Sequence, residues 1–153
     1  MENFKKVMLA AAIALTAGTA TAQDWNGAYG GAYALYDITA SQSGGGLRLG
    51  YNLQKSDGVF SVELDGFRES NGDTEAFVNV RAGYLFSDKF LGFASMGRGR
   101  YNGSVDLYAG GVGVEYMMTD AVSLRADYEL HNILGAPLGI GKRFFKLGAS
   151  WNF

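Results

Sequence analysis

Charged side chains that recur at every second residue are the feature of this sequence most able to do chemistry. They lie in rows of small and polar residues that alternate with apolar rows. Residues two apart share one face of a β-strand, so these charges meet on one face of a sheet. There they can neutralise one another as ion pairs or line a path for ions. The set has five basic and five acidic members: Arg48, Glu63, Asp65, Arg81, Arg98, Glu115, Arg125, Asp127, Glu129 and Lys146.

His131 is the only histidine, and it follows the last acidic residue of a polar row. A catalytic base must lie within hydrogen-bond reach of its nucleophile. Ser123 and Ser150 occupy polar rows too, but we expect both at other depths in the sheet. We therefore interpret His131 as a solvated or hydrogen-bonded histidine, and we predict no catalytic residue and no enzyme activity.

Motifs that hold cofactors or metals are missing from the sequence. It has no Walker-type phosphate loop, no His/Cys metal spacing and no acidic calcium loop. The glycine runs 44–46 and 110–111 do not open a helix, so we assign them to strand packing. We expect no cofactor and no dedicated metal site. Four acidic residues could bind divalent cations nonspecifically near a charged glycolipid: Asp37, Glu69, Asp73 and Asp106.

The first residues predict export. Lys5 and Lys6 precede an apolar stretch from Val7 to Leu15, and an A-x-A site ends at Ala22. The stretch is too short for a membrane-spanning helix, which needs about 20 residues. We predict a cleaved signal peptide over residues 1–22 and one domain over residues 23–153. The formal net charge of −2 gives no sign of a nucleic-acid partner, and a chain without cysteine forms no disulfide.

The rest of the chain alternates with a period of two, which is typical of β-strands. Glycine is abundant, with 23 residues, whereas proline occurs once. Short polar turns at 54–58, 87–89 and 119–121 alternate with mostly longer loops at 36–45, 69–73, 99–104 and 132–141. We predict an apolar row of Trp25, Tyr29, Tyr33 and Leu35 in the first strand. The eight alternating runs are 25–35, 47–53, 60–65, 76–86, 91–98, 108–116, 122–131 and 145–153.

Periodicity alone does not say which face of the sheet is inside. A soluble barrel or sandwich would place the apolar row inward. The polar row, however, combines balanced charges with Gly, Ala, Ser and Asn, and glycine weakens a strand without packing against anything. Such a row suits the narrow interior of an eight-stranded barrel, and the apolar row then faces lipid. We predict an all-β, eight-stranded, antiparallel up-and-down transmembrane barrel.

Four segments carry a family resemblance. Lys146, Gly148, Trp151 and Phe153 match the C-terminal β-signal of outer-membrane barrels, and the start Trp25-Asn26-Gly27-Ala28-Tyr29-Gly30-Gly31 is similar to W-x-G-x-Y-x-G. Arg81-Ala82-Gly83-Tyr84 and the segment 110–116 resemble internal strands. Together they resemble the small porin-family, or opacity-like, outer-membrane proteins. The resemblance implies both termini in the periplasm and folding by the barrel-assembly machinery, but the short loops depart from larger members.

Three function classes fit these features. The first is a structural protein of the Gram-negative outer membrane with a role in envelope integrity, its lumen filled by ion-paired side chains. The others are a narrow porin-like channel and a surface adhesion protein. We favour the first class, because eight strands leave little free bore. The partners expected are outer-membrane lipid and lipopolysaccharide, with signal peptidase and the assembly machinery during biogenesis, and we expect a monomer.

Overall fold

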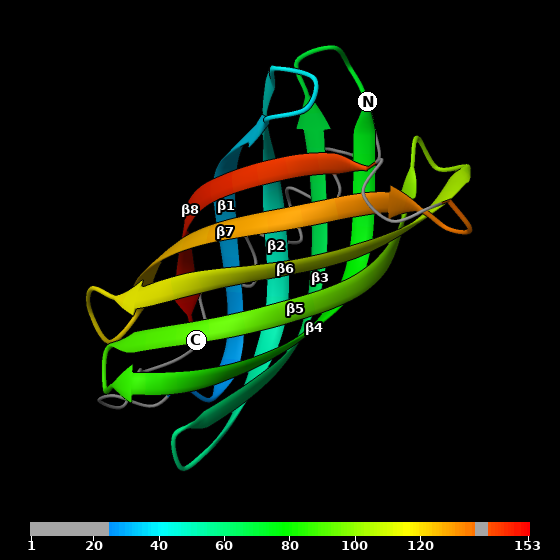
Figure 1. Ribbon diagram of the computed structural model, residues 1–153. Helices are drawn as coiled ribbons and strands as arrows, with labels where there is room; N and C mark the ends of the chain where they lie inside the picture. Colours follow the sequence, from blue (N-terminus) through cyan, green and yellow to red (C-terminus); the bar gives the residue numbers. More distant parts are fainter. Residues whose placement is uncertain (1–24, 137–140) are drawn as a thin grey trace.

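The protein is a closed barrel of eight antiparallel strands (Figure 1). The computed structural model describes residues 25–136 and 141–153. Each strand pairs with its neighbours in the chain, and β8 pairs with β1 to close the sheet. This confirms the predicted all-β, up-and-down architecture. The strands are β1 (Gly27–Asp37), β2 (Gln42–Lys55), β3 (Gly58–Glu69), β4 (Thr74–Ser87), β5 (Phe90–Tyr101), β6 (Val105–Met117), β7 (Val122–Ile133) and β8 (Lys142–Asn152).

The connections gather at two opposite ends of the barrel. Residues 56–57, 88–89 and 118–121 join strands at one end, the turn end. Residues 38–41, 70–73, 102–104 and 134–141 join them at the other, the loop end. Only the connection 134–141 is distinctly longer than the turns, so the predicted asymmetry of the two ends is small. The predicted signal peptide, residues 1–22, lies outside the described residues. In the described part of the chain, no helix has the length and apolar character needed to cross a membrane.

The residues just before β1 and just after β8 are held by hydrogen bonds at the turn end. The backbone N–H of Trp25 donates to the side-chain oxygen of Gln54 at 2.9 Å, and its indole N–H donates to the carbonyl of Asp88 at 3.1 Å. Phe153 donates its backbone N–H to the carbonyl of Ala28 at 2.9 Å. Trp25 precedes β1 and Phe153 follows β8, so both edges of the closing β1–β8 pair are held at this end.

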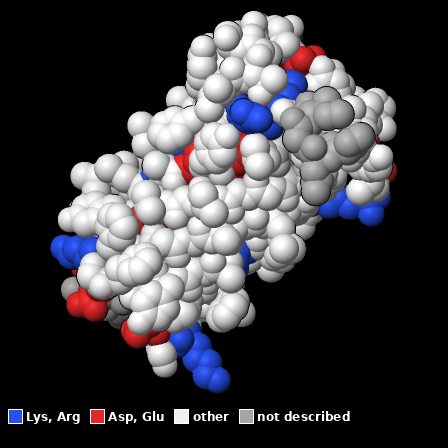
Figure 2. Space-filling view, in the orientation of Figure 1, with Lys and Arg blue, Asp and Glu red and all other residues white. Residues whose placement is uncertain are grey.

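The outer face of the barrel is apolar. The apolar rows predicted for β2–β4 and β6–β8 point outward, as Phe60, Val62 and Leu64 of β3 do, each more than half exposed. In Figure 2 the middle of the visible face is largely white, and blue side chains lie mainly toward its two ends. Apolar exposure on so many strands is suited to lipid and not to water.

The facing predicted for β1 was wrong, and glycines of β2 explain why. Tyr29 pairs with Gly50 and Tyr33 pairs with Gly46. A Cβ at either glycine would lie 2.4 Å from an atom of the tyrosine ring, so each ring occupies the space that a glycine leaves free. The residues that we expected on the apolar outer face are all buried inside: Trp25, Tyr29, Tyr33 and Leu35.

The prediction that β5 points Arg98 inward was wrong for the same reason. Phe93 pairs with Gly83 of β4 and with Gly113 of β6. A Cβ at Gly113 would lie 2.4 Å from the Phe93 ring, so this ring also points inward over glycine. Because strand neighbours alternate, Met96 and Arg98 then point outward, and both are exposed.

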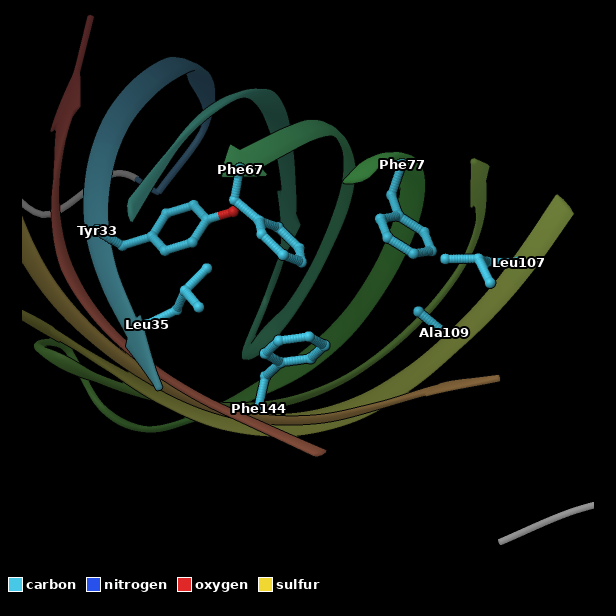
Figure 3. Packing of buried hydrophobic residues seen from close by; sticks show 7 residues of the cluster. All are labelled: Tyr33, Leu35, Phe67, Phe77, Leu107, Ala109 and Phe144. Carbon is cyan, nitrogen blue, oxygen red and sulfur yellow. The ribbon is translucent and has the colours of Figure 1, made fainter. Parts of the chain in front are cut away.

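Two apolar clusters occupy the two ends of the barrel interior. The turn-end cluster consists of Trp25, Val59, Leu85, Leu91, Phe93 and Met117. In the loop-end cluster, shown in Figure 3, side chains from several strands point toward one another across the interior. Its members are Tyr33, Leu35, Phe67, Phe77, Leu107, Ala109 and Phe144. A layer of charged side chains lies between these clusters, and Glu69 and Lys142 lie beyond the loop-end cluster, at the rim.

Replacing Gly50 by valine tests the packing of Tyr29. The added atoms would overlap the ring, so we expect Gly50→Val to lower the free energy of unfolding by about 1–3 kcal/mol or more. Gly110→Val is the matched control, since a Cβ there meets nothing closer than 3.9 Å. Urea unfolding of the refolded protein in lipid vesicles measures both. Equal stability of the two variants would contradict the packing assigned to Tyr29.

Candidate functional site

The interior charges come from alternate residues of the strands. The inward row of β3 runs from Val59 near the turn end to Glu69 at the loop end, and Glu63 and Asp65 occupy its middle. The inward row of β7 holds Arg125, Asp127, Glu129 and His131 in succession. A pleated strand points every second side chain the same way, so these rows place the charges as a layer between the two apolar clusters.

Arg125 is the centre of the first group of ion pairs. Its Nη1 lies 2.6 Å from Oε2 of Glu63, and its Nε lies 2.7 Å from Oδ1 of Asp127. The other oxygen of Asp127 lies 3.1 Å from Nη1 of Arg48. These four side chains are at most 2% exposed. Since they come from β2, β3 and β7, one chain of contacts crosses the barrel interior.

Arg81 extends this group toward β6. Its Nη2 lies 3.2 Å from Oε2 of Glu115, and its Nη1 lies 3.7 Å from Oε2 of Glu63. The hydroxyl of Ser123 donates to the other oxygen of Glu115 at 2.6 Å, and the hydroxyl of Tyr29 donates to Glu63 at 2.7 Å. The group thus matches three guanidiniums, of Arg48, Arg81 and Arg125, with three carboxylates.

Aromatic rings cover the guanidinium surfaces that the carboxylates leave open. Arg81 and Arg125 both lie against the ring of Phe93, at 4.4 and 4.5 Å from its centroid. Arg48 lies 4.4 Å from the ring centroid of Tyr33. Some guanidinium nitrogens of Arg48 and Arg81 have no hydrogen-bond partner, so cation–π attraction supplies part of their compensation.

Lys146 is the centre of a second group. Its Nζ lies 2.8 Å from Oε2 of Glu129 and 3.4 Å from Oδ1 of Asp65. Tyr33 donates its hydroxyl to the same oxygen of Asp65 at 2.6 Å. The rings of Tyr33 and Phe67 each lie 5.0 Å from Nζ. One ammonium here faces two carboxylates, so Glu129 depends on a further partner.

That partner is His131. Its Nε2 lies 2.9 Å from Glu129, and its Nδ1 lies 2.7 Å from Glu75 of β4. A neutral imidazole has one N–H donor, so two such contacts require a second proton within this group of three. The rings of Phe67, Phe77 and Phe144 surround the imidazole, with centroids 4.5–5.9 Å away. His131 therefore joins the charged layer to the loop-end cluster.

Lys142 lies at the loop end among four carboxylates. Its ammonium forms an ion pair with Glu69 and lies 3.7 Å from Glu75, 3.9 Å from Asp37 and 4.0 Å from Asp73. A pocket of about 260 Å³ lies beside it, and its lining includes His131. Hydrogen bonds from neighbouring side chains, that of Tyr101 first, lower the pKa of the Asp73 carboxyl below its usual range. Asp73 therefore stays ionised beside the ammonium.

The four acidic residues named from the sequence as possible cation ligands do not surround a common site for a cation. An ammonium, that of Lys142, lies among Asp37, Glu69 and Asp73. Asp106 lies apart from them, paired with arginines on the outer face. Among the described residues, no group of three or more His, Cys, Asp and Glu side chains is arranged to hold a metal ion.

The model of the outer membrane protein beta-barrel domain family matches residues 7–153. The chain belongs to this family. No curated protein matches this outer-membrane barrel.

Solved barrels resemble it in fold. The N-terminal β-barrel domain of Pseudomonas aeruginosa OprF has a TM-score of 0.62 and 15% identity, over 84% of this chain and 98% of that one. Neisserial surface protein A has a TM-score of 0.57 and 16% identity, over 82% and 97%. Yersinia pestis Ail, in a phospholipid bilayer nanodisc, has a TM-score of 0.58 and 12% identity, over 84% and 99%. At these identities the likeness concerns the fold alone.

The placement of Arg98 was predicted wrongly. Its side chain is 68% exposed on the outer face of the barrel, where Nη2 lies 3.4 Å from Asp106. The inward ring of Phe93 sets the facing of β5 and so turns Arg98 out. The other nine charged residues of the predicted set lie in the interior: Arg48, Glu63, Asp65, Arg81, Glu115, Arg125, Asp127, Glu129 and Lys146. The sequence reasoning missed Glu75 and Lys142 as interior partners.

The residues of the predicted β-signal lie on the closing strand or just after it. Lys146 points inward and Trp151 points outward from β8. Gly148 pairs with Tyr33, and a Cβ there would lie 2.5 Å from that of the tyrosine. Phe153 follows the strand and is half-buried. Their recognition during assembly stays a prediction.

Removing Arg125 tests the ion-paired layer. Arg125→Ala leaves Glu63 and Asp127 without their shortest cationic contacts, so we expect the free energy of unfolding to fall by about 3–5 kcal/mol. Arg98→Ala removes an exposed pair and should cost about 1 kcal/mol or less. Both are measured by urea unfolding in lipid vesicles, followed by the heat-modifiable gel shift. Similar losses of unfolding free energy in the two variants would show that the interior ion pairs contribute no more to stability than an exposed pair.

Proposed function

We propose that this outer-membrane barrel is a membrane-embedded scaffold with a closed lumen and a role in envelope integrity. The observation that carries this proposal is the continuous chain of ion pairs from Glu115 through Arg81, Glu63 and Arg125 to Asp127 and Arg48. Ion pairs that satisfy one another across a narrow interior hold side chains in place and leave few charged groups free to solvate a passing ion.

The two apolar clusters support a closed lumen. The turn-end cluster and the loop-end cluster lie on either side of the charged layer and contain several aromatic rings. A solute entering from the turn end would meet packed side chains before it reached the charged layer. One entering from the loop end would pass Lys142 and its carboxylates and would then meet the rings of the loop-end cluster. An eight-stranded barrel is only wide enough for its interior side chains to fill it. We therefore favour the scaffold over the porin-like channel.

The loops give less support to an adhesion role. The loops 38–41, 70–73 and 102–104 are short, and they are tied to the rim by hydrogen bonds. Asn102, for example, accepts a hydrogen bond from the backbone of Thr74 at 2.8 Å and donates to Asp73 at 3.1 Å. Binding surfaces on long variable loops have no counterpart in these three connections.

We also propose how the barrel is delivered and oriented. The segment 1–22 directs export and is removed by signal peptidase. Lys146, Gly148, Trp151 and Phe153 are then read by the assembly machinery in the periplasm. The turn end, which holds Trp25 and Phe153, stays in the periplasm, and the loop end faces outside, as in outer-membrane barrels with short periplasmic turns. The folded protein acts as a monomer.

Planar-bilayer recording tests the closed lumen. We expect no steady single-channel openings from the purified, refolded protein, because packed side chains fill the interior. Glu63→Gln should be equally silent. Steady wild-type openings whose cation–anion selectivity changes in Glu63→Gln would make the interior an ion path and would overturn the scaffold proposal.

Cysteine labelling of intact cells tests the orientation. The native chain has no cysteine, so Ser104→Cys at the loop end and Lys89→Cys at the turn end each provide one thiol. A membrane-impermeant maleimide should label Ser104→Cys in intact cells and Lys89→Cys only after the outer membrane is permeabilised. The reverse labelling pattern would contradict the proposed orientation, because it would place the turn end outside the cell.

A further inference from the structure

Among residues 25–136 and 141–153, the arginines of the outer face lie at one end of the barrel only. Arg68 and Arg100 are the last but one residues of β3 and β5, and Arg143 is the second residue of β8. Each is thus one residue from the loop end, and each side chain is exposed. Arg98 lies two residues deeper on β5 and is also exposed. We call these four residues the arginine belt.

Carboxylates neutralise this belt only in part. Asp106 lies 3.4 Å from Arg98 and 3.5 Å from Arg100, so one carboxylate serves two guanidiniums. In the described part of the chain, no carboxylate lies within 4.0 Å of the guanidinium of Arg68 or Arg143. The belt therefore keeps an excess of positive charge on the outer rim.

The turn end of the outer face has a different character. Its basic side chains, in the part of the chain that the structure describes, are Lys55 and Lys89. They lie at the edges of turns that also contain Asp57, Asp88 and Asp120. Many of its outward strand positions are aromatic: Phe60, Tyr84, Phe86, Phe90, Tyr116 and Trp151. Aromatic side chains are typical of a membrane interface on either side, whereas a cationic rim on one side only indicates that the two leaflets present different headgroups.

Guanidinium chemistry indicates the headgroup. A planar guanidinium donates two parallel hydrogen bonds to a phosphate, which a lysine ammonium does not. All four residues of the belt are arginines, and exposed apolar residues, Val105 and Ile133 among them, lie at the same end of the barrel. A phosphate carried by a membrane lipid would meet them there without leaving the bilayer interface.

We propose that the arginine belt, Arg68, Arg98, Arg100 and Arg143, binds the phosphate groups of lipopolysaccharide in the outer leaflet. This inference rests on the proposed orientation, in which the loop end faces outside. Binding anchors the barrel to the glycolipid layer around it and fixes its depth in the membrane. It also gives the scaffold a specific lipid partner.

Native mass spectrometry of the folded full-length mature protein in detergent tests the belt. The probe is purified lipopolysaccharide with a bisphosphorylated lipid A. Arg68→Ser/Arg100→Ser/Arg143→Ser should weaken binding on the order of 100-fold, as expected for the loss of three interfacial arginines. Lys55→Ser/Lys89→Ser removes two charges from the opposite end and should leave binding unchanged. The heat-modifiable gel shift verifies that each variant is folded.

A gain of binding excludes a folding artefact. Asp106→Asn removes the carboxylate that competes with phosphate for Arg98 and Arg100, so it should tighten binding. Raising the salt concentration should weaken wild-type binding, since the contacts are ionic and exposed. Unchanged affinity in the triple arginine variant, with the folded gel shift intact, would overturn the proposal.

Three further probes separate the glycolipid from other sources of phosphate. Dephosphorylated lipopolysaccharide should bind as weakly as the triple variant binds the intact glycolipid. Phosphatidylglycerol or inorganic phosphate that competes as well as lipopolysaccharide would refute a glycolipid site. These measurements need neither conductance nor orientation in cells, so their failure is distinguishable from failure of the scaffold proposal.

Discussion

Charge compensation at Glu63 is the interaction on which the rest of the barrel interior depends. A carboxylate in so narrow an interior costs several kcal/mol unless it is paired. Glu63 is bound by Arg125 and by the hydroxyl of Tyr29, with Arg81 close by. These partners come from β7, β1 and β4. Each strand must therefore keep its register, because a slip of one residue would turn its whole charged row to the outer face.

Glycines and aromatic rings make room for this compensation. Tyr29, Tyr33 and Phe93 lie over glycines of neighbouring strands and reach the charged layer from β1 and β5. There Tyr29 donates a hydrogen bond, and Phe93 contacts two guanidiniums. A high glycine content in a sequence suggests weak strand propensity. In this barrel the glycines leave room for the rings that contact the arginines of the interior.

The sequence was sufficient for the fold and for most of the interior layer. In β7 apolar and charged residues alternate without exception from Leu124 to His131, so its facing was predictable. In β1 and β5 an aromatic side chain counts as apolar whether it faces lipid or a guanidinium, and the glycine that decides between them lies on another strand. That is why the facing of Tyr33 in β1 and of Phe93 in β5 was predicted wrongly, and Arg98 was misplaced together with Phe93.

The contact between His131 and Glu75 could not be predicted from the sequence for a related reason. His131 and Glu75 are 56 residues apart, and only the register around the closed barrel brings them together. Lys142, at the start of β8, meets Glu69 and Glu75 in the same way. Partners of this kind follow from strand stagger and barrel closure, which local alternation does not specify.

Barrel closure also decides when the charges find their partners. Arg48 of β2 pairs with Asp127 of β7, Glu63 of β3 with Arg125 of β7, and Asp65 of β3 with Lys146 of β8. A nascent sheet of β1–β4 contains Glu63 and Asp65 without these cations, and the later strands supply them only when the two edges meet. The ion-paired layer therefore stabilises the complete barrel and not a partial sheet. Folding becomes a cooperative event, in which closure of the barrel brings the ammonium of Lys146 on β8 to Asp65 and Glu129.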